Sequence, residues 1–399
     1  MTVIPLNRLT VPIGACSMPF SATSDATYRL RQASSTHTER ASAIVYCEAN
    51  FGDIDGKTAN GLVRHSEKYD IVAVIDGTKA GLDAGSVLDG KPNGVPIYRD
   101  LADALKSFDI APSYFIYGKA PATGMLSTYE RNVVIAAIQS GMNIVNGLHE
   151  FLTADPEFVK AAMEANVTIL DVRKPRSKND LRLFSGRIND VSAPRIAVLG
   201  TDCAIGKRTT ANILTRALNE LGVNAVMIAT GQTGLIQGGR YGVALDAVPS
   251  QFCCGELEAT IIEANDIESP DVIIIEGQGA LSHPAFCTSA FILRGSAPDS
   301  VILQHAPNRK HRCDFERMAM PTPRSEIDLI QAFARTKVIG LTINHEDMDD
   351  EDVAKAILTY QDQLGIPVTD ALSRPTDDLL QMVFSAHPRL ARKPTVRPQ

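Results

Sequence analysis

The chain has 399 residues, enough for two or three domains whose apolar cores fold without disulfide bonds or structural metals. Its 39 Lys and Arg against 46 Asp and Glu leave a net charge of −7, so it lacks the positive excess with which proteins neutralise nucleic acid or an anionic membrane. Its longest apolar runs are far below the roughly 18 residues that cross a bilayer. We therefore expect no nucleic-acid partner and no membrane association.

The cysteines indicate a reducing compartment. They are odd in number and form no Cys-x-x-Cys pair, which predicts free thiols in a cytoplasmic protein and no metal site. The N-terminal residues contain prolines and arginine where a secretory signal would be apolar, so residues 1–40 are predicted to be a flexible leader.

From Ala41 onward, short β-branched runs alternate with longer amphipathic stretches, which is typical of an α/β fold with a parallel sheet and crossover helices. Residues 41–175 are predicted to form a Rossmann-like domain. No Gly-x-Gly-x-x-Gly follows the first strand, so a dinucleotide site is not predicted there. We expect strands at 43–46, 71–75, 114–117, 142–145 and 167–170, and helices at 100–107, 127–140 and 155–165.

A polar stretch at 173–193 marks a boundary, and residues 190–388 are predicted to form a second domain, a P-loop NTPase-like, doubly wound parallel sheet. Residues 389–399 are predicted to be a disordered tail. We expect strands at 195–199, 225–229, 271–275, 300–303, 338–343 and 367–370, and helices at 207–221, 254–265, 324–334 and 350–364.

The most specific motif is the segment Gly200–Lys207, here called the phosphate loop. A buried predicted strand leads into it and a predicted helix follows, so backbone N–H groups and the helix N-terminus converge on one point beside the Lys207 cation. This arrangement predicts a phosphate site. The residues expected to contact the ligand are Gly200, Thr201, Asp202, Cys203, Ala204, Ile205, Gly206, Lys207, Arg208, Thr209 and Thr210.

Two departures from the usual P-loop pattern bear on mechanism. Five residues separate Gly200 from Gly206, and Arg208 stands where ATPases have the Ser or Thr that ligates Mg²⁺. Because a guanidinium cannot ligate a cation, the sequence favours a site that holds a phosphorylated ligand without hydrolysing it. Thr209 is the alternative source of that hydroxyl.

The loop spacing resembles that of dethiobiotin synthetase and its relatives. Two more segments agree with the resemblance: Thr230–Gly234, which contains Gln232, and Ile273–Gly279. The resemblance implies that Glu276 is a polar site residue and that the strand end at Asn344 lies near a bound base.

A closer resemblance covers nearly the whole chain from residue 41. It rests on the altered phosphate loop and on two segments, 276–284 with Gln278 and Gly279, and 303–310. This set resembles a two-domain family of which one branch is described as D-glutamate (D-amino-acid) N-acetyltransferase. The resemblance implies acetyl-CoA as co-substrate and a small amino acid as acceptor.

Acetyl transfer fits the residues chemically, because acetyl-CoA carries a diphosphate and a ribose phosphate. Gly206, Lys207, Thr209 and Thr210 would hold the diphosphate, and either Arg208 or the pair Arg309–Lys310 would bind the remaining phosphate. Attack by an amine needs a general base, and the candidates are His283, His305 and Glu276. Gln232, Gln278, Gly279, Arg309 and Lys310 are the candidate substrate contacts.

Several points stay open in the sequence. Arg240, Arg173 or Lys174 could pair with a substrate carboxylate, and Cys203 is either a small turn residue or the site of an acetyl-cysteine intermediate. The alternatives to an acyltransferase are an ATP- and Mg²⁺-dependent ligase or kinase-like enzyme resembling dethiobiotin synthetase, and a non-catalytic nucleotide-binding protein. We expect a homo-oligomer.

Overall fold

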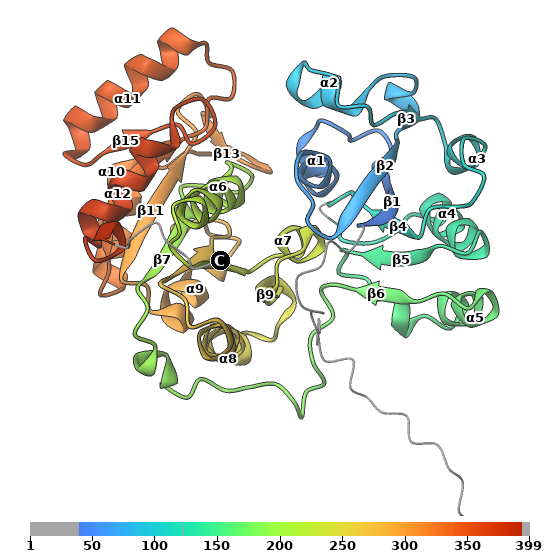
Figure 1. The fold of residues 1–399 in the computed structure, drawn as a ribbon, viewed down its shortest axis with the longest axis horizontal. Coiled ribbons are helices and arrows are strands. Elements are labelled where there is room, and N and C mark those ends of the chain that lie inside the picture. Colours follow the sequence, from blue (N-terminus) through green and yellow to red (C-terminus); the bar gives the residue numbers. More distant parts are fainter. Residues whose placement is uncertain (1–39, 122, 393–399) are drawn as a thin grey trace, which may run out of the picture. The chain divides into compact units, whose positions relative to one another are not determined.

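The computed structural model describes residues 40–121 and 123–392, so nearly all of the predicted leader and the end of the predicted tail lie outside the described residues. The described residues belong to one compact unit built around two parallel sheets (Figure 1). Among them no helix is both long and apolar enough to span a bilayer. The α/β fold predicted from the sequence is confirmed.

The first sheet has the strand order β3-β2-β1-β4-β5-β6, and every pairing is parallel. Its helices cover both faces and bury two separate apolar clusters. The strands are β1 (Ala41–Tyr46), β2 (Tyr69–Ile75), β3 (Ile97–Tyr98), β4 (Tyr114–Tyr117), β5 (Asn143–Asn146) and β6 (Ile169–Asp171). The helices are α1 (Lys57–Arg64), α2 (Ala84–Asp89), α3 (Leu101–Leu105), α4 (Thr128–Gln139) and α5 (Pro156–Ala165).

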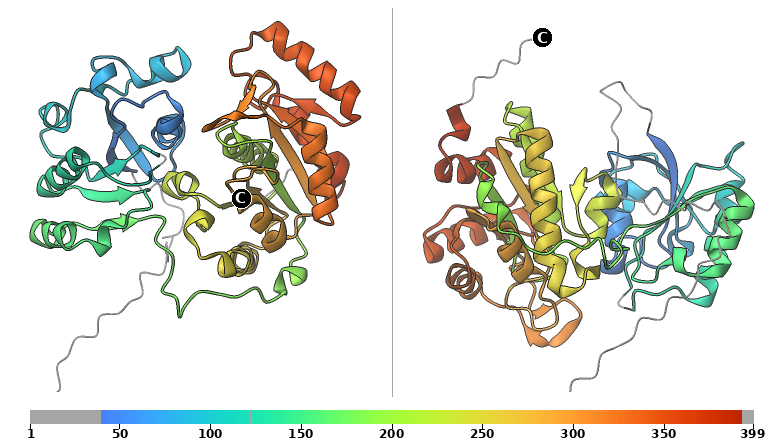
Figure 2. Two further views of the ribbon diagram at one scale, coloured as in Figure 1. Left: turned by 180° about the vertical axis from the view of Figure 1, so that it is seen from behind. Right: turned by 90° about the horizontal axis from the view of Figure 1, so that it is seen from below.

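The second sheet has the order β15-β14-β11-β7-β10-β8-β9 and is also parallel throughout (Figure 2). The strands are β7 (Arg195–Gly200), β8 (Ala225–Ala229), β9 (Tyr241–Gly242), β10 (Val272–Glu276), β11 (Ser300–His305), β14 (Lys337–Ile343) and β15 (Val368–Thr369). A separate hairpin joins β12 (His311–Arg312) to β13 (Phe315–Ala319).

Helices cover both faces of this sheet. The apolar residues of α6 and α12 pack on one face, and those of α8, α9, α10 and α11 on the other. These helices are α6 (Lys207–Glu220), α7 (Gln232–Gln237), α8 (Ser250–Glu268), α9 (Thr288–Ser296), α10 (Pro323–Phe333), α11 (Asp350–Leu364) and α12 (Thr376–Ala386). The doubly wound arrangement brings the carboxyl ends of β7, β10 and β11 side by side, because β7 lies between the other two.

The structure differs from the predicted elements in three ways. The two-residue strands β3 and β9, the hairpin strands β12 and β13, and the helices α1, α2, α7, α9 and α12 were not predicted. Helix α8 begins at Ser250 rather than residue 254, because Pro249 stands at its N-cap and no side chain caps its first turn, so the sequence has no start signal there. A helical turn, Leu390–Arg392, occupies the start of the predicted tail, and Leu390 is buried against the α6 and α12 cluster.

Helix α7 joins the two sheets. Its Leu235 and Ile236 belong to the same apolar cluster as Val45 and Phe51 of the first domain. The Gln237 amide donates to the carbonyls of Gly61 (2.7 Å) and His65 (2.8 Å), so the cluster is flanked by polar contacts that fix α7 against α1.

The chain between the two sheets is held by buried carboxylates. Glu258 of α8 accepts the backbone N–H groups of Ser185 (2.6 Å) and Ile188 (3.1 Å), and Glu256 accepts that of Arg182 (2.7 Å). Both carboxylates are almost fully buried. The polar composition predicted a linker here, and the structure shows that its backbone is fixed to α8.

Candidate functional site

The phosphate loop connects β7 to α6 as the spacing predicted. Gly206 has φ +98°, a left-handed conformation that side chains rarely adopt, and it directly precedes the first residue of the helix. A Cβ at Gly200 would lie 2.8 Å from the Ile205 side chain and 2.9 Å from the Lys207 stem. The two glycines therefore let the loop fold tightly around the lysine.

Lys207 is buried beneath the loop, and its ammonium donates to the carbonyl oxygen of Asp202. Burial lowers the pKa of this lysine, whereas Asp202 and Glu276 nearby raise it. Thr210 donates to Gln304 on the neighbouring strand β11 (2.7 Å), and the Asn344 side chain lies beside Gly206. These contacts fix the loop around the predicted anion position.

Glu276 ends β10, the strand next to the loop. Its carboxylate accepts the backbone N–H of Thr230 (3.0 Å) and is buried at 5% exposure. Burial raises the pKa of this carboxyl, although Arg208 and Lys207 act in the opposite direction. The Gln278 amide donates to the carbonyl of Thr230, so the predicted Glu-Gly-Gln and Thr-Gly-Gln segments meet at one place.

Arg208 extends away from the loop toward the first domain. Its guanidinium donates to Gln237 of α7, and a Cβ on Gly61 of α1 would lie 2.6 Å from its Nη2 atom. The contact between Arg208 and a CoA phosphate stays a prediction, and a bound phosphate would share the guanidinium with Gln237. Arg208 stands where ATPases have the Mg²⁺-ligating hydroxyl. In this structure it connects α6 to α7.

Arg309 supports the outer side of the loop. Its guanidinium donates to Asp202 Oδ2 (3.1 Å) and to the carbonyl of Cys203 (2.8 Å), and it pairs with Glu346 (2.7 Å). Both carboxylates neutralise it, so its predicted substrate contact would have to compete with them. Lys310, the other member of the predicted pair, borders a cavity beside the loop.

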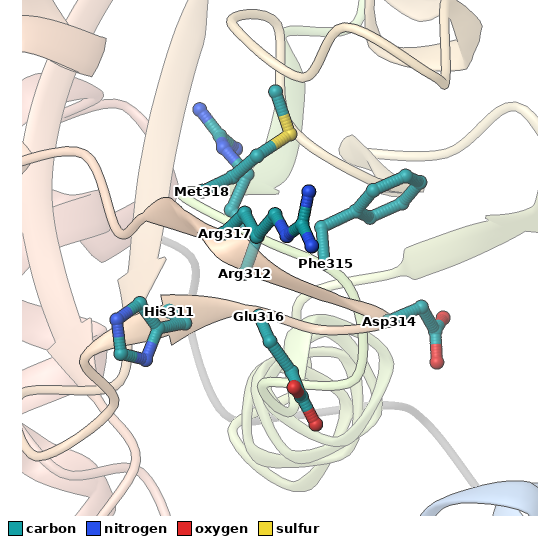
Figure 3. Close-up of a pocket in the computed structure, with 7 residues that line it drawn as sticks. All are labelled: His311, Arg312, Asp314, Phe315, Glu316, Arg317 and Met318. Atoms are coloured by element: carbon teal, nitrogen blue, oxygen red, sulfur yellow. The ribbon is translucent and has the colours of Figure 1, made fainter.

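The hairpin β12–β13 contacts the phosphate loop. It was not predicted from the sequence. The backbone N–H of Cys313 donates to Asp202 Oδ2 (2.7 Å), and Arg312 donates to the carbonyl of Thr201 (3.2 Å) and the hydroxyl of Ser282 (2.8 Å). The hairpin residues line a cavity of about 540 Å³, with Arg312 and Phe315 on one side of the hairpin and Glu316 on the other (Figure 3).

His283 packs against the rings of Phe286 and Phe315, which also contact each other. Its Nδ1 atom accepts the backbone N–H of Ala285 (3.2 Å), so the neutral ring carries its proton on Nε2, which lies 3.8 Å from Asp202 Oδ1. Burial lowers the pKa of the ring. Among the described residues, neither Nε2 nor Asp202 Oδ1 has a hydrogen-bond partner, and the role of His283 as a base stays a prediction.

His305 is the third base candidate, at the end of β11. Its Nδ1 atom bonds the Thr201 hydroxyl (2.9 Å), and its ring packs edge-on against Tyr360. Burial, followed by the charge of Arg309, lowers its pKa to about 4. The ring is therefore neutral near pH 7 and a weak proton acceptor.

Asp202, Cys203 and His283 place one ligand atom each within 4.8 Å of one another, the spacing of a metal site. The hydrogen bonding does not fit a metal. A ligating histidine donates its second ring N–H to a neighbour, whereas His283 Nδ1 accepts one from Ala285. Lys207, Arg309 and Arg312 also surround the cluster with positive charge.

The three cations predicted to bind a substrate carboxylate all have protein partners. Arg173 pairs with Asp246 (2.8 Å), Arg240 pairs with Glu268, and Lys174 donates to Thr153 (2.7 Å). The predicted substrate residue Gln232 is buried in α7, against Gly147.

Lys57, at the first position of α1, is a candidate site residue that the sequence did not single out. Burial raises the pKa of the Cys203 thiol, and the positive charges of Lys207 and Lys57 oppose that change. Lys57 is exposed, and this weak opposing effect of its charge on the thiol pKa is what links it to the phosphate loop. The signal that could have found it is the polar segment after the first strand, whose helix was not predicted.

Comparison with known families identifies both domains. Residues 77–175 match the domain of unknown function DUF1611_N, a Rossmann-like domain, and residues 182–380 match DUF1611_C, a P-loop domain. The chain belongs to the DUF1611 family. A crystal structure of a DUF1611 family protein from Anabaena variabilis matches it with a TM-score of 0.81 and 30% identity, covering 87% of this chain and 100% of that one.

Two relatives of this DUF1611 chain carry a functional name. A Pseudoalteromonas protein named D-glutamate N-acetyltransferase is 33% identical over 272 residues, which cover 67% of this chain and 80% of the relative. A Tritonibacter scottomollicae protein of the same name is 28% identical over 261 residues, covering 64% and 76% respectively.

Proposed function

We propose that this protein transfers the acetyl group of acetyl-CoA to the amino group of an amino acid, with D-glutamate as the first candidate acceptor. The names of the two DUF1611 relatives support the reaction class. The observation that carries the proposal in this chain is the phosphate loop, because it keeps an anion cradle and its lysine but has Arg208, bound to Gln237, in the Mg²⁺-ligating position.

The CoA diphosphate would bind at the loop, where backbone N–H groups and the N-terminus of α6 meet Lys207. Thr210 and Gln304 brace the loop from β11. Because this donor does not transfer a phosphoryl group, no metal is needed to neutralise a charged transition state at phosphorus. The loop then acts as an anchor for the donor.

Glu276 is the general base in this proposal. His283 has its accepting nitrogen occupied by a backbone N–H and His305 has a strongly lowered pKa, whereas burial raises the pKa of the Glu276 carboxyl. As the amine attacks the thioester carbonyl, Glu276 takes its proton, the C–S bond breaks and the CoA thiolate leaves. The new bond is the amide of the N-acetyl product.

Lys57, Gln278 and Gly279 would form the acceptor side. Gly279 has φ +57°, and a Cβ there would lie 4.0 Å from Cys203 Sγ, so this turn lies directly beside the loop. Lys57 supplies a positive charge on the same side, where a carboxylate of the amino acid would bind.

The test is release of free thiol from acetyl-CoA by the purified protein, with D- and L-amino acids offered singly in the presence of a chelator. We expect release with D-glutamate and a sharply raised acetyl-CoA requirement in Lys207→Ala. Lys160→Ala, on the exposed face of α5, is the matched control and should behave like the wild type. Absence of release with every amine, together with Mg²⁺-dependent ATP loss when carboxylic acids are supplied, would overturn the proposal.

A further inference from the structure

A cavity of about 460 Å³ lies beside the phosphate loop, within the range of roughly 300–1,000 Å³ typical of small-molecule sites. Its wall includes the cationic residues Arg309, Lys310 and Arg324 and the ring of Tyr360, and none of the described residues that line it is acidic. Helix α10 begins at this wall with Pro323, so its positive dipole end adds to the field. The cavity is therefore suited to an anion.

The three cations of the cavity differ in how far they are already neutralised. Arg309 is paired with Asp202 and Glu346, and Arg324 donates to the carbonyl groups of Gln363 (2.9 Å) and Leu364 (3.3 Å) at the end of α11. Among the described residues, the Lys310 ammonium has neither an ion pair nor a hydrogen bond. Arg324 has no carboxylate partner among the described residues and keeps its charge too, so Lys310 is the cavity cation whose charge and hydrogen bonds are both left for a ligand.

The cavity adjoins the phosphate loop through two of its lining residues. Arg309 donates to the carbonyl of Cys203 in the loop (2.8 Å), and His305 bonds the Thr201 hydroxyl (2.9 Å). A ligand that reaches both places needs two phosphate groups set a short distance apart on one rigid unit. The ribose of CoA meets this requirement, because it carries the diphosphate on its 5′ carbon and a phosphate monoester on its 3′ carbon.

We propose that this cavity binds the adenosine 3′-phosphate end of acetyl-CoA, with Lys310 on the 3′-phosphate and the Tyr360 ring against the adenine. The inference rests on the proposed acetyl transfer and adds to it the place of the donor's far end. It also separates donor from acceptor, since the acceptor residues Lys57, Gln278 and Gly279 do not line this cavity.

The experiment compares two donors, acetyl-CoA and acetyl-3′-dephospho-CoA, which differ by one phosphate. For the wild type we expect the KM of the dephospho donor to be about tenfold higher, since a single charge-assisted contact is lost. In Lys310→Ala the two KM values should become equal, because the KM of acetyl-CoA rises to that of the dephospho donor. Lys310→Arg should restore the difference.

Lys355→Ala is the matched control, because this lysine lies on α11 with Tyr360 but outside the cavity. It should keep the wild-type ratio between the two donors. Equal KM values in the wild type would overturn the inference, as would a Lys310→Ala change that raises the KM of the amino acid instead of the donor. Failure of the proposed function looks different, since neither donor would then be consumed.

Discussion

Glu276 combines burial with two neighbouring cations, and this environment sets its protonation. Burial favours the neutral carboxyl and raises its pKa, while Arg208 and Lys207 stabilise the carboxylate. The raised pKa brings the group closer to neutrality, where a general base is most effective. Lys207 in turn donates to the Asp202 carbonyl, and the charge of Glu276 opposes the lowering of its pKa by burial.

Replacement of Glu276 by Gln removes the base while keeping a side chain of similar size. We expect kcat to fall by roughly 10²–10⁴-fold. The wild-type kcat/KM should rise with pH through the raised pKa of Glu276, since the protonated carboxyl cannot accept the amine proton, and this limb should be absent in the variant. A pH series of thiol release measures both effects.

His305→Gln provides the comparison for that experiment. Because its pKa is lowered to about 4, His305 is neutral across the working range and should not produce the rising limb. If His305→Gln removes the limb while Glu276→Gln keeps it, the assignment of the base is wrong.

The sequence predicted those parts of the site whose residues lie close together in the chain, because their spacing forms a recognisable motif. The phosphate loop, its lysine and the neighbouring Glu276 lie together as the motifs indicated. The contacts of Arg208 with Gln237 and of Arg309 with Glu346 join residues far apart in the chain, so no local pattern reveals them. Lys57 was missed for the same reason.

At the scale of the elements, long periodic segments were predicted and short ones were not. Strands β1, β7 and β14 and helices α6 and α11 have clear apolar periodicity and occur close to their predicted ranges. Strands β3 and β9 have two residues each, which is too short for an alternating pattern. Every residue of α7 is buried, so this helix has no polar face to mark its periodicity. The hairpin β12–β13 likewise owes its position to contacts with the loop rather than to its composition.

Helix α4 depends on its first turn. Ser127 and Glu130 form a capping box, and Glu130 also accepts from Tyr117 (2.7 Å) and Lys119 (2.9 Å). Burial opposes ionisation of Glu130, but hydrogen bonds from Ser127, Lys119 and Tyr117 outweigh it and lower its pKa to about 2. The folded state therefore binds this proton less readily than the unfolded chain, whose value is near 4.5.

This difference predicts a stabilisation that is present above about pH 4.5 and lost as the pH falls toward 2, worth about 3 kcal/mol. We expect Glu130→Gln to lower the free energy of unfolding by about 2 kcal/mol at neutral pH and to flatten its acid dependence. Urea unfolding at pH 7, 4.5 and 3 measures both. Equal acid dependence in the variant and the wild type would contradict the account of this cap.

At the scale of the whole molecule, the two sheets share an apolar cluster through α7. Ile236 is 2% exposed and packs with residues of the first domain although it belongs to the second. The predicted domain limits, the homo-oligomer, the cytoplasmic location and the absence of nucleic-acid and membrane partners stay predictions. The shared cluster could not be predicted, because periodicity identifies buried faces but not which domain covers them.

The shared cluster predicts that both domains unfold together. We expect one calorimetric transition, and Ile236→Ala should lower the free energy of unfolding by about 3 kcal/mol. Hydrogen exchange should accelerate in β1 as well as in β7. Leu358→Ala, whose side chain is exposed on α11, should change neither. Two separate transitions, with β1 unaffected by Ile236→Ala, would show that the domains are independent.

The central claim is that the phosphate loop anchors an acyl donor without ATP or Mg²⁺. The most direct measurement follows the acetyl carbon atoms. Acetyl-CoA labelled with ¹³C in the acetyl group is incubated with the protein, a chelator and D-glutamate. The products are then identified by mass spectrometry. The account predicts ¹³C-labelled N-acetyl-D-glutamate and unlabelled CoA in equal amounts. Two results together would contradict this function: the labelled acetyl-CoA stays intact with every amino acid tried, and a phosphorylated product forms once ATP and Mg²⁺ are added.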